Sequence, residues 1–346
     1  MHMADALISP AVGGTMWAAS AGLLAWCARK VRQTLDNRLV PLMGVLGAFV
    51  FAAQMINFSI PATGSSGHLG GGLILAVLLG PHAALPVIAS VLAVQALFFA
   101  DGGLLALGCN IWNLGFYPAF IAYPFIYRPL AGGDRSGMRA WLAAVLAAVV
   151  GLQLGALSVV LETTASGVSS LPFGTFTLLM SPIHLAIGIV EGLATAAVVA
   201  FVARARPEAL DLPVVPTDAR GGLRPVLLGL VLVTVLVGGA VSWFASTHPD
   251  GLEWSIARVT GSEEFEGGAG LRETLARVQE RTAFLPDYGF KAGEETGTKP
   301  EEAGPHPWPA VSAGTTVSGV VGGALVLVLA GLAGLALRPR RLEPGR

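Results

Sequence analysis

The sequence is poor in charge and in cysteine, and both shortages narrow the range of functions. Charged residues make up 12% of its 346 positions, about half the share found in soluble domains. The two cysteines, Cys27 and Cys109, lie in or beside apolar segments and form no spaced metal motif, so a disulfide is not indicated. The net charge of −1 gives no reason to propose a nucleic-acid partner.

Several enzyme motifs are also missing. The sequence has no GxxxxGKS or GxxxxGKT phosphate loop, so we do not expect the chain to hydrolyse ATP itself. It has no HExxH motif, which argues against a zinc hydrolase of that type, and its membrane Ser and His residues lack a nucleophile motif. No basic residue precedes the first apolar run, so we expect no cleaved signal peptide and Met1 as the mature start.

Long apolar runs are abundant, because 53% of the residues are hydrophobic. Several runs exceed the ~20 residues that cross a bilayer. They predict an all-α fold, a polytopic transmembrane helical bundle. The segments are 11–28, 39–57, 69–80, 83–100, 104–127, 139–162, 173–203, 224–246 and 314–337. The third segment is short and is closed by Gly80-Pro81, so it either crosses or re-enters the membrane.

Basic residues predict the orientation. Fifteen of the twenty-one Lys and Arg residues fall in four short segments, which the positive-inside rule places in the cytoplasm. They are Arg29, Lys30, Arg32 and Arg38, then Arg128, Arg135 and Arg139, then Arg204, Arg206, Arg220 and Arg224, and finally Arg338, Arg340, Arg341 and Arg346. All four basic segments lie on the cytoplasmic side if the third apolar segment counts as a crossing. We therefore predict seven crossings and then two more in the cell inner or plasma membrane, with the N-terminus outside and the C-terminus cytoplasmic.

The chain divides into two modules on this prediction. Residues 1–204 form the first transmembrane domain, and the polar, Pro-bearing stretch 205–223 is a cytoplasmic linker. Residues 224–346 form a second module, in which two transmembrane helices flank an extracellular loop at 247–313. Within this loop, the apolar spacing at 271–285 indicates a short amphipathic helix. The acidic character of the loop suggests a role in attracting cations, although acidic loops are usually only solvated.

The first residues, MHMADALISP, offer a metal three nitrogens in a row. These are the α-amine of Met1, the amide of His2 and the imidazole of His2, which close a five-membered and a six-membered chelate ring. Planar nitrogen coordination suits Ni(II) or Cu(II) better than zinc. The glycine-rich stretch ATGSSGHLGGG at 62–72 carries His68 on the same predicted membrane face, so a second imidazole is placed to complete the square. A plain hydrogen-bonded His at a helix start remains the alternative.

Other polar residues interrupt the apolar segments, where they are costly unless paired. Gln95, Asn110 and Asn113 are such residues, and a functional role is the default hypothesis for them. For Gln95 and Asn113, hydrogen bonding from helix to helix is a strong alternative. Asp101, at a Gly-Gly break, is expected near the cytoplasmic or central part of the bundle, so we do not expect it to touch a metal captured outside. A structural role, or support of a ligand from outside the coordination shell, is favoured instead.

A second polar group lies further along the chain. His184 and Glu191 share one helix face two turns apart, and Glu162 lies near the outer end of the sixth segment. One interpretation of these residues is a proton relay or a second metal site. The other is a buried, hydrogen-bonded polar pair that packs the bundle.

Three stretches carry a resemblance to a known family. MHMADALISP resembles the MHIPDGxLSP start of the CbiM/NikM family, residues 64–113 from GSSGHLGGG to GCNIWN resemble its core, and HLAIGIVEGLAT is similar to its last helix. Residues 244–255, FASTHPDGLEWS, and the final apolar segment resemble the PDGLE/NikN-like component. The sequence therefore resembles a fused protein of the NikMN or CbiMN type.

The resemblance implies the substrate-specific component of an energy-coupling-factor ABC importer for Ni²⁺ or Co²⁺, with no enzyme activity or cofactor of its own. It implies Met1, His2 and His68 as metal ligands. It also implies a transmembrane coupling protein of the CbiQ/NikQ type and cytosolic ATPases of the CbiO/NikO type as partners. Asp5 and Ser66 are candidates to support the ligands from outside the coordination shell. Met3-Ala4 and Ala6 depart from the family start, which puts the path of the N-terminal loop in question.

Three functions thus remain to be separated. The first is the transport component, and the second is a membrane metalloenzyme built on His184, Glu191 and Glu162. The third is a metal-binding scaffold or sensor without transport. The nitrogen ligand set and the fused arrangement favour nickel over cobalt.

Overall fold

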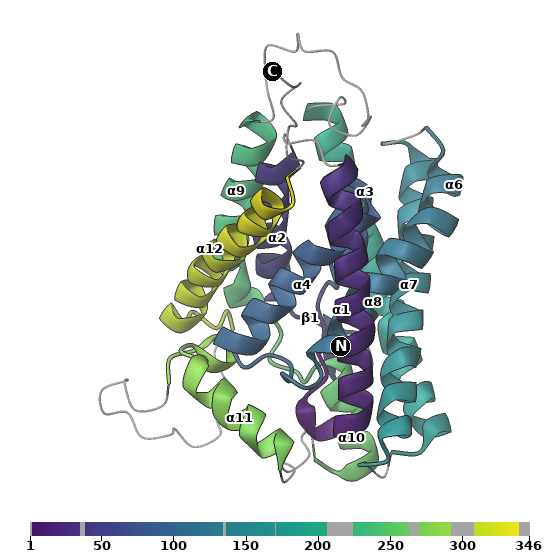
Figure 1. Ribbon diagram of the computed structural model, residues 1–346, viewed down its shortest axis with the longest axis vertical. Helices are drawn as coiled ribbons and strands as arrows, with labels where there is room; N and C mark the ends of the chain where they lie inside the picture. Colours follow the sequence, from purple (N-terminus) through teal and green to yellow (C-terminus); the bar gives the residue numbers. More distant parts are fainter. Residues whose placement is uncertain are drawn as a thin grey trace, which may run out of the picture.

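The computed structural model describes residues 2–34, 39–133, 136–169, 171–205, 224–262, 270–291 and 308–338, and it is a helical bundle (Figure 1). In this part of the chain, five helices are long and apolar enough to cross a membrane: α1 (Pro10–Thr34), α4 (Pro81–Phe98), α7 (Met138–Ser166), α8 (Phe173–Ala205) and α12 (Ala313–Ala336). Two shorter apolar helices are α2 (Leu39–Gln54) and α9 (Arg224–Gly239). The predicted all-helical membrane fold is confirmed.

The third predicted segment is the short helix α3 (Gly72–Leu79). Its eight residues rise only ~12 Å, so α3 alone does not cross a bilayer. Helices α2 and α4 run parallel to each other, so α3 and the loops beside it carry the chain back from the end of α2 to the start of α4. The end of α4 meets the end of α2 through a Gln95–Gln54 hydrogen bond of 2.9 Å. A hairpin of β1 (Phe58–Ile60) and β2 (Ser65–Gly67), with Ser59 opposite Ser66, leads into α3.

The fifth predicted segment is a continuous run of α5 (Leu107–Ile111), the π-helical η2 (Trp112–Tyr127) and α6 (Arg128–Ala131). Pro118 and Pro124 lie inside η2, and proline cannot donate the backbone hydrogen bond of a regular α-helix. The start of α3 approaches this run so closely that a Cβ at Gly72 would overlap the carbonyl oxygen of Leu114. Gly72 therefore sets how α3, and the loop before it, sit against η2.

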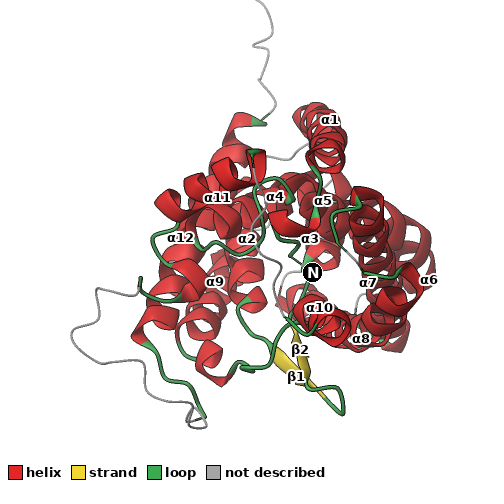
Figure 2. Ribbon diagram, turned by 90° about the horizontal axis from the view of Figure 1, so that it is seen from below, coloured by secondary structure: helices red, strands yellow, loops and turns green. Residues whose placement is uncertain are grey.

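Two helix groups flank the centre of the bundle. Seen from the end that carries α10, α7 and α8 lie on one side and α9 and α12 on the other, with α2, α3 and α4 between them (Figure 2). Small residues allow these helices to approach closely, as is typical of membrane bundles. Large apolar side chains such as Leu178, Leu228 and Leu232 point outward and are more than two-thirds exposed, as expected of a lipid-facing surface.

The contact between α9 and α12 depends on glycine. A Cβ at Gly319 would overlap the carbonyl oxygen of Gly238, whereas a Cβ at Gly331, on the same helix α12, would meet nothing within 4 Å. We expect Gly319→Ala to lower the free energy of unfolding by about 1–3 kcal/mol through overpacking, and Gly331→Ala to leave it nearly unchanged. Thermal unfolding of the two purified variants measures the difference, and equal melting temperatures would contradict this packing.

The second module places its short elements at one end of the bundle. These elements are η4 (Val241–Phe244), α10 (Gly251–Thr260), α11 (Leu271–Thr282) and η5 (Pro286–Tyr288). The C-terminal ends of α1, α6, α8 and α12 lie at the opposite end of the bundle (Figure 1). The predicted amphipathic helix at 271–285 is confirmed as α11. Apart from Ala205, the predicted linker at 205–223 lies outside the described residues, and the division into two modules stays a prediction.

Candidate metal-capture site

The N-terminal segment before α1 is folded into the bundle. Met3 is fully buried, and its backbone N–H donates to Oδ1 of Asn110 at 2.9 Å. Its carbonyl oxygen accepts hydrogen bonds from the Asn110 side chain and from the Gly103 amide. The segment therefore pairs with the loop and helix start after α4, although Met3-Ala4 departs from the family sequence. Met1, one of the predicted ligands, lies outside the described residues.

His2 and His68 lie side by side. Their ring centroids are 4.9 Å apart, and the His2 side chain is only 5% exposed. His68 donates from Nδ1 to the carbonyl oxygen of Leu69 at 3.0 Å, which leaves the lone pair on its Nε2. Burial lowers the pKa of His68 to about 3, so the imidazole is neutral, which is the form that binds metals.

Asp101 also belongs to this site. His2 Nδ1 lies 2.7 Å from Asp101 Oδ1, and the hydroxyl of Tyr288 donates to Asp101 Oδ2. Burial opposes ionisation of Asp101, but the His2 imidazole and these two hydrogen bonds outweigh it and lower the pKa of the carboxyl. The expected position of Asp101 at the cytoplasmic or central part of the bundle is wrong, because Asp101 contacts His2, whereas its expected supporting or structural role stays a prediction. Helix α4 ends at Phe98 beside the N-terminal segment, not at the centre of the bundle.

Glu191 holds the loop that carries His68. Its two carboxylate oxygens accept the backbone N–H groups of Gly70 at 2.7 Å and Gly71 at 3.2 Å. Gln54 donates to the carbonyl oxygen of Gly70 at 2.9 Å. Gly71 has φ +78°, a conformation that side chains disfavour. Helix α8 thus fixes the backbone immediately after His68, and Glu191 is a satisfied polar group that positions this loop.

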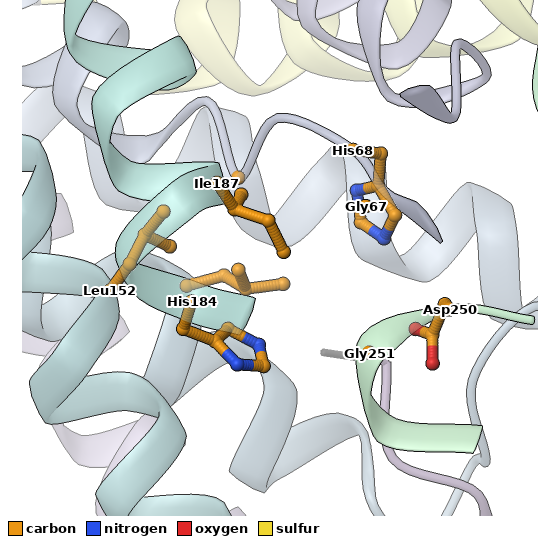
Figure 3. Close-up of a pocket in the computed structure, with 9 residues that line it drawn as sticks. Gly67, His68, Leu152, His184, Ile187, Asp250 and Gly251 are labelled. Atoms are coloured by element: carbon orange, nitrogen blue, oxygen red, sulfur yellow. The ribbon is translucent and has the colours of Figure 1, made fainter. Parts of the chain in front are cut away.

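His184 lies two turns before Glu191 on α8 and faces a small cavity (Figure 3). Its Nδ1 donates to the carbonyl oxygen of Met180 at 2.8 Å, and its buried Nε2 has no hydrogen-bond partner. His68 and Asp250 line the same cavity, which has room for about one water molecule. His184 and Glu191 therefore lie on one face as predicted, but their side chains engage different partners.

The third member of the metalloenzyme hypothesis, Glu162, accepts a hydrogen bond from Asn113 at 2.8 Å. Among the described residues, no three His, Cys, Asp or Glu side chains come close enough together to hold a metal. A capture site that uses backbone nitrogens and two imidazoles does not require such a cluster. The predicted helix-to-helix roles of Gln95 and Asn113 agree with their hydrogen bonds to Gln54 and Glu162.

Asp5 and Ser66, the two candidate supporting residues, contact other groups. Asp5 Oδ1 accepts the backbone N–H of Ala106 at 3.0 Å, so it fastens the N-terminal segment to the start of α5. Ser66 donates from its hydroxyl to the carbonyl oxygen of His248 at 2.8 Å and from its amide to that of Pro249. Ser66 thereby joins the hairpin to the second module.

The second module forms a wall of the site. A cavity of about 390 Å³ is lined by His2, His68 and Asp101 and, from the second module, by His248, Asp250, Glu253 and Tyr288. Asp250 caps α10 by accepting the amides of Leu252 and Glu253, while Glu253 accepts the amide of Asp250. Burial, together with the Asp250 carboxylate, raises the pKa of Glu253 to about 7.

Two further side chains of the second module reach the loop around Asp101. Gln279 donates to the carbonyl oxygens of Ala96 and Gly102, at 2.9 and 2.7 Å. Burial and the Asp101 charge raise the pKa of Tyr288 well above 10, so its hydroxyl stays a donor at neutral pH. Asn110 stands out in the sequence as a polar residue inside an apolar segment, but no local pattern places Asn110, Gln279 or Tyr288 at this site, because their partners lie about 100 or more positions away in the chain.

Comparisons with known proteins agree with this architecture. Residues 2–209 match the family described as cobalt uptake substrate-specific transmembrane region, and residues 224–339 match the PDGLE domain. A putative fused nickel transport protein NikMN of Archaeoglobus fulgidus is 33% identical over 332 residues, which cover 95% of this chain and 96% of that protein. The fused nickel transport protein NikMN of Rhodobacter capsulatus is 31% identical, covering 83% of this chain and 88% of its own.

A solved structure is similar as well. The crystal structure of a truncated transition metal transporter has a TM-score of 0.53 and 31% sequence identity, and it covers 59% of this chain and 99% of its own. The resemblance to CbiM/NikM and PDGLE proteins is thus confirmed. The chain belongs to the nickel and cobalt transport family whose substrate-specific transmembrane region matches residues 2–209, and it carries a PDGLE domain at residues 224–339.

Proposed function

We propose that the chain is the substrate-binding component of an energy-coupling-factor importer, which captures Ni²⁺ on the outer side of the membrane. The proposed ligands are the Met1 amine, the His2 amide and imidazole, and the His68 imidazole. The observation that carries this proposal is the contact between the His2 and His68 imidazoles, whose ring centroids lie 4.9 Å apart, with His2 in an N-terminal segment folded into the bundle. The fused nickel transport relatives support nickel as the cargo.

The surroundings of the pair suit a cation that arrives hydrated and is then stripped of water. Six water molecules take up about 180 Å³ at about 30 Å³ each, which is less than the cavity of about 390 Å³. Deprotonation of the His2 amide would offset part of the metal charge, and charge is expensive at membrane depth. The proposed orientation, with α10 and α11 outside, follows from the basic residues near the opposite ends of the helices.

In this proposal, the chain holds the metal but does not drive its transport. A transmembrane coupling protein of the CbiQ/NikQ type and cytosolic ATPases of the CbiO/NikO type would supply the movement. The acidic loop at 247–313 is proposed to help load the cation. Deletion of 262–303 would not isolate this charge effect, because it also removes Gln279 and Tyr288, which contact the site.

Uptake measurements with and without the partners test the proposal. We expect cells that express the chain with its coupling protein and ATPases to accumulate ⁶³Ni²⁺, and cells that express the chain alone to accumulate little. Excess Co²⁺ should compete less well than excess unlabelled Ni²⁺. Binding without partner-dependent uptake would favour the scaffold or sensor hypothesis, and preferential competition by Co²⁺ would reassign the cargo.

A further inference from the structure

A chain of hydrogen bonds connects the second module to His2. Tyr288 donates to one oxygen of Asp101, and the other oxygen of Asp101 pairs with His2 Nδ1 at 2.7 Å. The three residues come from η5, from the loop after α4 and from the N-terminal segment. Asp101 and Tyr288 are separated by 187 positions in the chain, so the fold of the second module brings them together.

Tyr288 is held firmly in place. Its ring stacks on Phe99, with the centroids 5.1 Å apart and the planes inclined by 20°. The backbone of Asp287 donates to the carbonyl oxygen of Phe99 at 2.9 Å. Asp287 and Tyr288 both have positive φ, +49° and +59°, which costs non-glycine residues about 1–3 kcal/mol each. The stacking on Phe99 and the backbone hydrogen bond of Asp287 help to offset this cost. They hold the turn in the conformation that directs the Tyr288 hydroxyl to Asp101.

The chelate proposed for His2 places a requirement on its ring. A six-membered chelate from the His2 amide uses Nδ1 of the imidazole, because Nε2 is too far along the ring to close it. In the structure, Nδ1 is the nitrogen paired with Asp101, and Nε2 is buried without a partner. A half-turn about the Cβ–Cγ bond exchanges the two edges of the ring. It frees Nδ1 for the metal and brings Nε2 to the side of Asp101.

We propose that Tyr288 is a positioning residue for metal capture: it holds the Asp101 carboxylate so that Asp101 accepts the Nε2–H of His2 when Nδ1 binds the metal. The inference rests on the proposed function of His2. Metal-binding histidines commonly donate their second ring nitrogen to a carboxylate, and losing such an outer partner weakens metal binding about 10–100-fold. The PDGLE domain therefore completes the capture site through Tyr288, in addition to covering it.

Ni²⁺ titration of the purified full-length chain tests this inference. Tyr288→Phe keeps the ring that stacks on Phe99 and removes only the hydroxyl. We expect this variant and Asp101→Asn to bind Ni²⁺ about tenfold or more weakly. The ligand-field absorption of the bound Ni²⁺ should shift in both variants. Tyr123→Phe removes the same hydroxyl from a tyrosine that stacks on Tyr127 within η2, and it should bind as the wild type does.

The double variant separates positioning from general stability. Because Tyr288 acts through Asp101, adding Tyr288→Phe to Asp101→Asn should lower the Ni²⁺ affinity by less than about twofold. If the two residues acted independently, their separate losses of affinity would multiply. Full additivity, or wild-type binding by Tyr288→Phe, would overturn the inference. His2→Ala is measured alongside these variants. If His2→Ala still binds Ni²⁺ normally, the proposed function itself fails, and that result is distinguishable from a failure confined to Tyr288.

Discussion

Replacement of His2 by alanine is expected to abolish Ni²⁺ accumulation in cells that express the complete transporter. The purified variant should bind Ni²⁺ more than about 100-fold more weakly, since loss of an outer partner alone costs about 10–100-fold and this change removes a ligand. The His2 ring lies between His68 and Asp101 and is 5% exposed.

A second variant tests the chelate rather than the imidazole alone. One alanine inserted between Met1 and His2 keeps every side chain but separates the amine from the His2 amide, so the five-membered chelate ring cannot close. We expect uptake to fall as it does in His2→Ala. His82→Ala serves as the matched control, because His82 packs on Trp26 and Phe120 at the start of α4. Normal uptake by the insertion variant would remove the N-terminal amine from the ligand set.

The sequence predicted the features of this site that depend on local chemistry. A Met-His start is a chelating group wherever the segment lies, and glycines around His68 indicate a tight loop regardless of its partners. The third apolar segment is unusually short, but its length alone does not show whether it crosses the membrane. The structure shows that α3 begins at Gly72, level with the Gln54–Gly70 contact, and returns the chain within the bundle.

The features that the sequence did not predict depend on contacts between distant segments. Hydropathy predicts too deep a position for the break at Asp101 and Gly102, because it does not show where α4 ends relative to the N-terminal segment. Tyr288 lies in a loop with no periodic pattern, and only the fold brings it to Asp101. A shared helix face pairs Glu191 with His184 in the sequence, but in the structure the carboxylate of Glu191 accepts hydrogen bonds from the buried amides of Gly70 and Gly71 instead.

These amides make Glu191 a residue whose loss should affect both stability and capture. Glu191→Ala leaves two buried N–H groups without acceptors, and each unsatisfied group costs about 1–3 kcal/mol. We therefore expect the free energy of unfolding to fall by about 2–6 kcal/mol. The loop after His68 would also lose its anchor on α8, so Ni²⁺ binding should weaken even in protein that remains folded.

Two companion variants separate these effects. Glu191→Gln keeps one carbonyl oxygen for the Gly70 amide but turns an NH₂ group toward one of the two donors, so its loss of stability should lie between wild type and Glu191→Ala. Thr195→Val changes a buried polar residue one turn further along α8, whose hydroxyl has no hydrogen-bond partner, and should change little. Thermal unfolding ranks the stabilities of all three variants, and Ni²⁺ titration ranks their affinities. If Glu191→Ala binds Ni²⁺ like the wild type, the backbone after His68 does not need its anchor on α8, and Glu191 contributes to stability alone.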